Sequence, residues 1–184
     1  RTYGVIMKKE KKGLEAVRAL ARELDPEPEH AFQVCKTALS IFDQTLELHG
    51  CGTREREVLE AAALLHDTGY RTSAKAHHKH SRDIILGLEL PGFDASERKV
   101  VACIARYHRK ALPDAAHRVY GELPAKDQDT VRRLAAILRI ADGLDRSHAN
   151  SAESVNVVQE KLALCLYVKQ CRISLMDIPA GQNK

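Results

Sequence analysis

Apolar side chains recur every three or four residues along most of the chain, the spacing that places them on one face of an α-helix. Leu14, Val17 and Leu20 form the stripe of the first such stretch. In all, six stretches show this spacing, at residues 10–24, 29–48, 53–69, 78–88, 94–107 and 126–144. Residues 113–124 lack it, and we expect an irregular connection there with a short helical turn at most. The pattern predicts a helical domain over residues 1–150.

Several residues mark the expected ends of these helices. The two prolines of "DPEPEH" separate the first helix from the second, and proline is favoured in the first turn of a helix. Gly50 is placed to end the second helix, because glycine readily adopts the left-handed conformation found there. Thr53 is the expected N-cap of the third helix, and Asp94 or Ser96 that of the fifth.

The pattern changes after Ser151. The segment "SVNVVQEKLALCLYVKQCRISLMDI" alternates apolar and polar residues and is rich in Val, Leu and Ile, which predicts two or three short strands. We therefore expect a mainly α fold, a helical bundle with a small C-terminal β appendage over residues 151–184.

Composition narrows the class of protein. Hydrophobic residues make up 44% of the 184 residues and aromatics only 4%, so the core should be aliphatic and disorder is not expected. A net charge of +4 suits an anionic ligand but is too small to predict nucleic-acid binding. The chain has no apolar run of about 18 residues, which predicts no membrane span. Five scattered cysteines without a CxxC pair favour a reducing, cytoplasmic location.

Polar groups interrupt the apolar stripes at positions where they are costly. His66 and Asp67 follow the apolar "LEAAALL", and a buried carboxylate requires a cationic partner. A helix-terminal histidine beside a capping aspartate would explain the pair equally well. Asp142 lies four residues after Leu138 on the edge of its stripe, either as a ligand or as a partner of Arg139 or Arg146. Asp145 is the rival ligand.

Three further histidines, His30, His80 and His108, lie at or near helix ends. Each alone reads as an ordinary helix-end residue, but donors on facing helices are how helical domains assemble metal sites. Histidines and carboxylates without thiolates suit Mn, Fe, Zn, Co or Ni and leave coordination positions open for water and substrate. The sequence therefore predicts a centre for a divalent metal ion.

The order His30, His66-Asp67, Asp142 resembles the H…HD…D signature of the HD superfamily of metal-dependent phosphohydrolases. The surrounding segments "EHAFQVCKTALSIFDQ", "IARYHRKALP" and "RRLAAILRIADGLDRSH" look like the C-terminal HD-type domain of the exopolyphosphatase and guanosine pentaphosphate phosphatase family. The resemblance covers residues 14–148. The start, "RTYGV", is similar to the junction that follows the actin-like domain of that family, so we expect a preceding domain.

The resemblance implies roles for the candidate residues. His30, His66, Asp67 and Asp142 would hold one metal ion, with Asp67 and His66 as the catalytic pair. Dinuclear members of the superfamily carry extra histidines between the HD pair and the last aspartate. On that basis His80 and His108 would hold a second ion with Asp67 as a bridge. His78 is the alternative to His80, and His77 is expected to face solvent.

The activity implied is hydrolysis of a phosphoester or phosphoanhydride, on a nucleotide or polyphosphate-like substrate. Basic residues beside the presumed ligands would bind its phosphate groups, and each could instead belong to a solvated surface. These are Arg109 and Arg146 first, then Lys79 and Arg106, with Arg82 and Lys110 as further candidates.

A second function is compatible with the same residues. In the family, catalysis is credited to the upstream actin-like domain, so this chain could be a non-catalytic module that binds polyphosphate or nucleotide, or that forms a homodimer. An RNA-binding protein is not favoured, since aromatic platforms and a dense basic stripe are missing from the sequence. The expected partner is a phosphate-containing small molecule or polyphosphate, with neither nucleic acid nor membrane.

Overall fold

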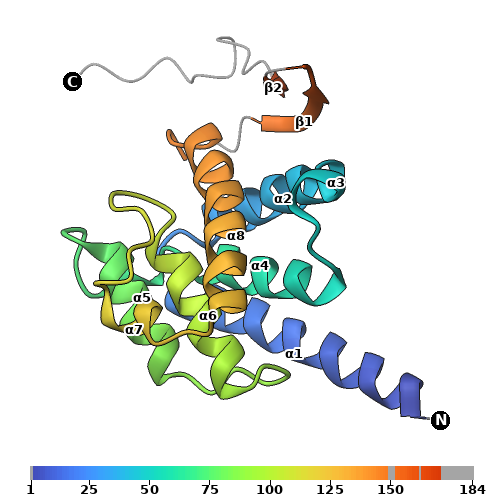
Figure 1. The fold of residues 1–184 in the computed structure, drawn as a ribbon. Helices are drawn as coiled ribbons and strands as arrows, with labels where there is room; N and C mark the ends of the chain where they lie inside the picture. Colours follow the sequence, from blue (N-terminus) through green and yellow to red (C-terminus); the bar gives the residue numbers. More distant parts are fainter. Residues whose placement is uncertain (1, 149–151, 162, 171–184) are drawn as a thin grey trace, which may run out of the picture.

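The computed structural model describes residues 2–148, 152–161 and 163–170, with side chains from residue 13 onward. Within these residues the chain is mainly helical and ends in a two-stranded antiparallel sheet (Figure 1), which confirms the predicted fold class. The elements in chain order are α1 (Thr2–Leu24), α2 (Pro28–Gln44), α3 (Leu46–His49), α4 (Thr53–Leu65), the 3-10 helix η1 (Thr68–Arg71), α5 (His77–Gly87), α6 (Ala95–Arg106), α7 (Arg118–Gly121), α8 (Ala125–Leu144), β1 (Ala152–Gln159) and β2 (Leu164–Gln170).

The core is aliphatic, as the low aromatic content predicts. Helix α4 lies at its centre and packs against α1, α2, α6 and α8 (Figure 1). Leu59 and Leu65 of α4 and Leu138 of α8 are fully buried. Residues 61–63 of α4 are three alanines, and all of them are buried. Their small side chains let neighbouring helices approach α4 from several sides, because interiors are packed without voids.

The predicted second helix is divided into two. Pro28 is the first residue of α2, as the proline signal indicated. The helix stops at Thr45, whose hydroxyl donates a hydrogen bond back to the carbonyl oxygen of Ile41 at 2.8 Å. The short helix α3 then ends at Gly50, which has the left-handed conformation (φ 59°) that a helix end demands.

The structure shows which residues are the N-caps of α6 and α4, for which the sequence offered candidates. Asp94, rather than Ser96, caps α6, because its Oδ1 accepts hydrogen bonds from the backbone N–H groups two and three residues later, both at 2.8 Å. Gly52, rather than Thr53, precedes α4. The side chain of Glu55 accepts a hydrogen bond from the Gly52 N–H at 2.9 Å, so the acidic residue three positions on satisfies this helix start.

The third helix was predicted to reach Gly69, but α4 ends at Leu65 and the chain turns through η1. Gly69 packs directly on the start of α5: a β-carbon there would lie 2.0 Å from the carbonyl oxygen of His77 and 2.5 Å from the nitrogen of Ser81. The Gly69 N–H also donates to the Ser81 hydroxyl at 2.9 Å. Any side chain at this position would push α5 away, so the glycine holds the start of α5 beside Asp67.

The hairpin of β1 and β2 packs against α2 through β1. Ala152 and Val155 are its buried residues. The amide of Gln44 donates to the carbonyl oxygen of Val155 at 2.9 Å and accepts the Val157 N–H at 2.9 Å, which fixes the hairpin to α2. A third strand would fall on residues 171–178, which lie outside the described residues.

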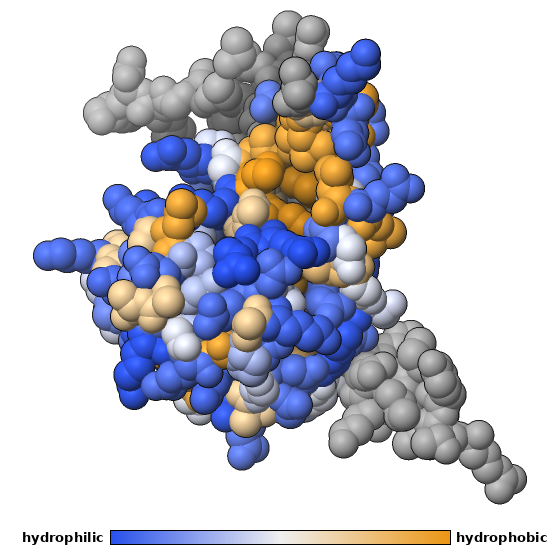
Figure 2. Space-filling model, viewed as in Figure 1, coloured by the Kyte–Doolittle hydropathy of each residue, from blue (hydrophilic) through white to orange (hydrophobic). Residues whose placement is uncertain are grey.

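The expected short turn within residues 113–124 is present as α7. On the face shown in Figure 2, apolar surface gathers over α2, α3 and the hairpin, and most of the remaining surface is hydrophilic. Leu46 and Leu48 of α3 are each about half exposed. None of the helices in the described part of the chain combines the length and apolar character that crossing a membrane requires.

Candidate metal centre

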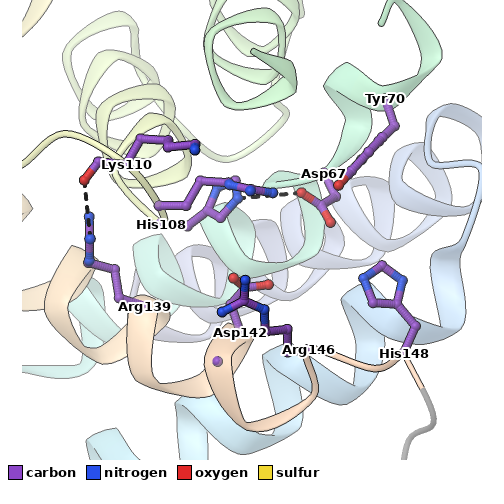
Figure 3. A pocket seen from close by; sticks show the side chains of 10 residues that line it. Asp67, Tyr70, His108, Lys110, Arg139, Asp142, Arg146 and His148 are labelled. Atoms are coloured by element: carbon purple, nitrogen blue, oxygen red, sulfur yellow. Dashed lines mark hydrogen bonds and ion pairs between the residues drawn. The ribbon is translucent and has the colours of Figure 1, made fainter. Parts of the chain in front are cut away.

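Six acidic and imidazole residues meet where the ends of five helices converge. They are His30 in the first turn of α2, His66 and Asp67 directly after α4, His77 at the start of α5, His108 just after α6, and Asp142 in the last turn of α8. Five of them are buried, and Asp142 is partly exposed. Figure 3 shows Asp67, His108 and Asp142 from the open side of this centre.

A first cluster contains the four residues of the H…HD…D signature, His30, His66, Asp67 and Asp142, and one ligand atom of each lies within 4.8 Å of the others. Oδ1 of Asp142 is 3.4 Å from Nε2 of His30 and 3.5 Å from Nε2 of His66. Oδ2 of Asp67 is 3.7 and 3.5 Å from the same two nitrogens. Four donors therefore face one small volume.

A second cluster uses the other oxygen of Asp67. Its Oδ1 lies 3.2 Å from Nε2 of His77 and 3.5 Å from Nε2 of His108. The two Nε2 atoms are 3.3 Å apart. Because Oδ2 faces the first cluster and Oδ1 faces the second, Asp67 has the geometry of a bridging carboxylate.

The protein fixes the imidazoles from behind. The Nδ1–H of His66 donates to the carbonyl oxygen of Ala63 at 2.7 Å, and that of His108 donates to Ala105 at 2.6 Å. The Nδ1–H of His30 donates to Oδ2 of Asp145 at 2.8 Å. A proton held on Nδ1 leaves the Nε2 lone pair of the neutral ring free, which is the arrangement found in metal-binding histidines.

The residues fit a divalent cation. Nε2 of His30, Nε2 of His66 and Oδ1 of Asp67 are buried and have no hydrogen-bond partner within the described residues. Buried polar atoms without partners are costly, and a cation would satisfy all three. Ligands about 2.1 Å from one ion lie roughly 3.0–3.4 Å from one another, close to the separations found in both clusters.

The electrostatics of the centre favour positive charge, and a metal ion bound to Nε2 of His66 would displace the proton that the ring otherwise holds. Burial would lower the pKa of His66, but Asp67 and Asp142 outweigh it and raise that pKa to about 9. Burial likewise opposes ionisation of Asp142, yet His30 and His66 hold its pKa well below the usual range. Burial and the neighbouring His66 lower the pKa of His108 to about 3. The centre thus has ionised carboxylates and at least one neutral imidazole.

The second cluster differs from the sequence prediction in one member. His80 was expected there, but it is partly exposed and belongs to neither cluster. His77, expected to face solvent, is only 2% exposed and lies against Asp67 instead. Helix α5 begins at His77, and three residues at 1.5 Å each carry His80 away from the centre along the helix axis. His78, the alternative, is buried but is also absent from both clusters.

Asp145, the rival ligand of the sequence analysis, has a different place. It is 1% exposed and contacts Nδ1 of His30 rather than the shared volume of the first cluster. Its spacing of three residues from Asp142 was the available signal, because both then project from the same helix end. Asp145 orients a candidate ligand, and the sequence alone does not distinguish this role from direct coordination.

A basic pocket of about 430 Å³ opens onto Asp67, His108 and Asp142 (Figure 3). Its other side chains are Tyr70, Arg109, Lys110, Arg139, Arg146 and His148. The predicted phosphate binders Arg109 and Arg146, and the weaker candidate Lys110, therefore line it. Lys79 is exposed and is not among the lining residues.

Arg106, also predicted to bind phosphate at this centre, lies elsewhere. It is buried and lines a separate pocket between α5, α6 and α7, as does Arg82. Both residues flank histidines in sequence, but their positions on their helices direct them away from the centre.

Three lining residues were not predicted as pocket residues. Arg139 was considered only as a partner of Asp142, whereas it donates to the carbonyl oxygens of Tyr107 and Lys110, both at 3.2 Å. His148 stacks on His30 with ring centroids 3.7 Å apart. Tyr70 stacks on His77 at 3.8 Å. Tyr70 follows Asp67 by one turn of η1, and this closeness in sequence was the one signal for it.

Comparison with known proteins agrees with the resemblance in the sequence. The chain is similar to proteins named guanosine-5'-triphosphate,3'-diphosphate pyrophosphatase. The one from Pseudoalteromonas translucida is 39% identical over 83 residues, which are 44% of this chain and 17% of that protein. The one from Pseudoalteromonas atlantica is 25% identical over 142 residues, 76% of this chain and 28% of that protein. The one from Aeromonas hydrophila is 31% identical over 114 residues, 61% and 22% respectively.

The chain spans less than a third of the length of these relatives. The family model described as Ppx/GppA phosphatase, domain III, matches residues 14–175. Since this match covers most of the chain, including all six residues of the candidate metal centre, the protein belongs to the Ppx/GppA phosphatase domain III family.

Proposed function

We propose that this chain is a metal-dependent phosphohydrolase of the HD type that acts on a nucleotide or polyphosphate-like phosphoanhydride. The observation that carries the proposal is the pair of ligand clusters joined by Asp67 beneath a basic pocket. Carboxylates and imidazoles with free Nε2 atoms suit a dinuclear centre, and the pocket beside them has the charge to hold phosphate groups.

The names of the relatives support the class of reaction. Each is named as a pyrophosphatase of guanosine-5'-triphosphate,3'-diphosphate, which is a phosphoanhydride hydrolase. The convergence of His30, His66, Asp67 and Asp142 supports the HD assignment, because these residues match that signature and lie within one cluster.

The side chains of the two clusters have separate roles in this proposal. His30, His66, Asp67 and Asp142 would hold one divalent ion, and Asp67, His77 and His108 would hold a second. Bound ions would lower the pKa of a water molecule and stabilise negative charge on the phosphoryl oxygens. Asp67 faces the basic pocket directly, whereas the fully buried His66 would act through the ion that it holds beside Asp67. Asp145 fixes the ring of His30 from behind.

The basic side chains bind and orient the substrate. Arg109 and Arg146 line the pocket beside Asp67 and Asp142, where guanidinium groups can each grip a phosphate through two hydrogen bonds. In the reaction, a water oxygen forms the new bond to phosphorus, the bridging P–O bond breaks, and the proton that the water loses passes to the leaving phosphate or to solvent. The leaving phosphate departs with the bonding electron pair, and Arg109 and Arg146 neutralise its growing charge.

A metal analysis combined with a phosphate-release screen tests this function. We expect purified protein to bind Mn, Fe, Ni, Co or Zn and to release phosphate from guanosine polyphosphates or polyphosphate, and Asp67→Ala to lose both properties. Wild type without metal, equal to the variant in every assay, would refute the proposal. Metal and anion binding without any phosphate release would favour the non-catalytic module instead.

A further inference from the structure

Arg106 is a buried cation without an acidic partner. This residue is only 7% exposed and lies at the end of α6. Within the described residues no carboxylate lies close enough to form an ion pair with it, and its Nε–H is buried without a hydrogen-bond partner. A buried charge is strongly disfavoured unless an opposite charge or several hydrogen bonds compensate for it. Among the described residues, Arg106 therefore has no anionic neighbour that compensates its charge.

The space beside Arg106 has room for one. A pocket of about 290 Å³ is lined by residues of α5, of α6 and of α7 with the turn before it, and it shares no lining residue with the pocket at the metal centre. Its polar lining is mostly basic: Arg82, Arg106, His117 and Arg118, with Tyr107. This second pocket is independent of the ligand clusters.

Acidic groups do not neutralise this lining. Asp83 is the one carboxylate among its lining residues, and Arg82 already pairs with it through a hydrogen bond of 2.8 Å from Nε and an ion-pair contact of 2.6 Å from Nη2. The side chain of Asp83 is also 57% exposed, so solvent screens its charge. The positive charge of Arg106 and Arg118 is left over, which favours an anionic ligand.

The groups around Arg106 shape the pocket for an oxyanion. The guanidinium carbon lies 5.4 Å from the centre of the Tyr107 ring, so the aromatic ring covers one side of the cation. The guanidinium also lies near the Tyr107 hydroxyl, and its remaining N–H groups are left to donate to a ligand, as arginine does when it binds phosphate. The Tyr107 hydroxyl is 2.9 Å from Nδ1 of His117. This contact fixes the His117 ring at the same pocket.

We propose that the Arg106 pocket binds a phosphate group, from inorganic phosphate or from the end of a polyphosphate chain. Arg106 donates the central pair of hydrogen bonds, and Arg118 and Arg82 contribute charge at the rim. The site is separate from the proposed catalytic function, and its occupancy does not require metal.

Titration of the full chain with inorganic phosphate and with tripolyphosphate, in EDTA, tests the proposal. The readout is the arginine Nε–H resonance of Arg106 in a ¹⁵N NMR spectrum. We expect this resonance to shift and saturate. Tripolyphosphate saturating at the lower concentration indicates a chain end as the ligand, and equal or tighter binding of inorganic phosphate indicates free phosphate. Absence of a saturable shift with both anions would overturn the proposal.

Variants separate the site from general charge effects. Arg106→Gln should weaken binding by at least about tenfold, the loss of one charged hydrogen-bond donor pair. The exposed Arg118→Gln, which leaves the interior packing untouched, should weaken binding by a smaller factor. Lys99→Gln, which removes one charge from α6 outside the pocket, should bind phosphate as wild type does. Equal affinity in the Arg106 and Lys99 variants would contradict the assignment.

Discussion

The cluster around His66 and the cluster around His108 share Asp67, but they differ in the charges that surround them. The first contains a second carboxylate, Asp142, and has Asp145 behind His30. The second has no carboxylate beyond Asp67, and Nη1 of Arg109 lies 3.4 Å from Nε2 of His77. Two negative charges in one cluster and an adjacent cation in the other imply unequal affinity for divalent ions.

One bridging carboxylate can therefore belong to two metal sites that differ in their affinity for the ion. The first cluster should fill at lower metal concentration and stay filled, while the second should exchange its ion. Four sets of variants test this comparison, from the largest expected effect to the smallest.

Asp67→Ala should remove both ions, because Asp67 supplies one oxygen to each cluster. We expect metal content near zero after dialysis and loss of any phosphate release. Inductively coupled plasma mass spectrometry measures the metal, with circular dichroism as the check on folding. Retention of one ion per chain would show that Asp67 is not a bridge.

Asp142→Asn should abolish the tight site and leave the weak one. The substitution preserves shape but removes one of the two carboxylate charges of the first cluster, so the affinity of that site should fall by more than the roughly 10–100-fold that a lost outer partner costs. Isothermal titration with Mn²⁺ would then show only the weaker binding event. Loss of the weak event alone would reverse the ranking of the two sites.

His77→Gln should remove the weak site and spare the tight one, and His80→Gln is its matched control. The two histidines lie one helical turn apart in α5, but only His77 lies near Asp67. We expect the weak event to vanish from the Mn²⁺ titration in His77→Gln and to persist in His80→Gln. The opposite pattern would restore the assignment of His80 that the sequence favoured.

Asp145→Asn should have the smallest effect. An amide can still accept the Nδ1–H of His30, but it no longer adds negative charge behind the ring. Affinity at the tight site should fall by roughly 10–100-fold, as expected for an outer partner of a ligand, and the number of bound ions should not change. If the tight site is lost altogether, Asp145 is itself a ligand.

Much of the fold followed from local pattern. The helical spacing around Leu59, Leu65 and Leu138 predicted the helices that form the core, because a buried stripe must recur with the helical period. The change to alternating residues after Ser151 predicted the hairpin. Helix ends were less well predicted: Thr45 divides one expected helix, and α4 stops at Leu65, since these ends depend on side-chain hydrogen bonds and on packing against other elements.

The sequence by itself determined which chemical groups are available: it placed His30, His66, Asp67, His108 and Asp142 at the edges or ends of apolar stripes, where they must face inward together. Only the tertiary structure shows that His77, rather than His80 or His78, lies beside Asp67, because the contact of Gly69 with α5 sets where that helix begins. The same holds for Arg106, which follows the helical period of α6 into another pocket although it is two residues from His108. Spacing along the chain fixes the face of a helix, but the neighbours of that face depend on how the helices pack.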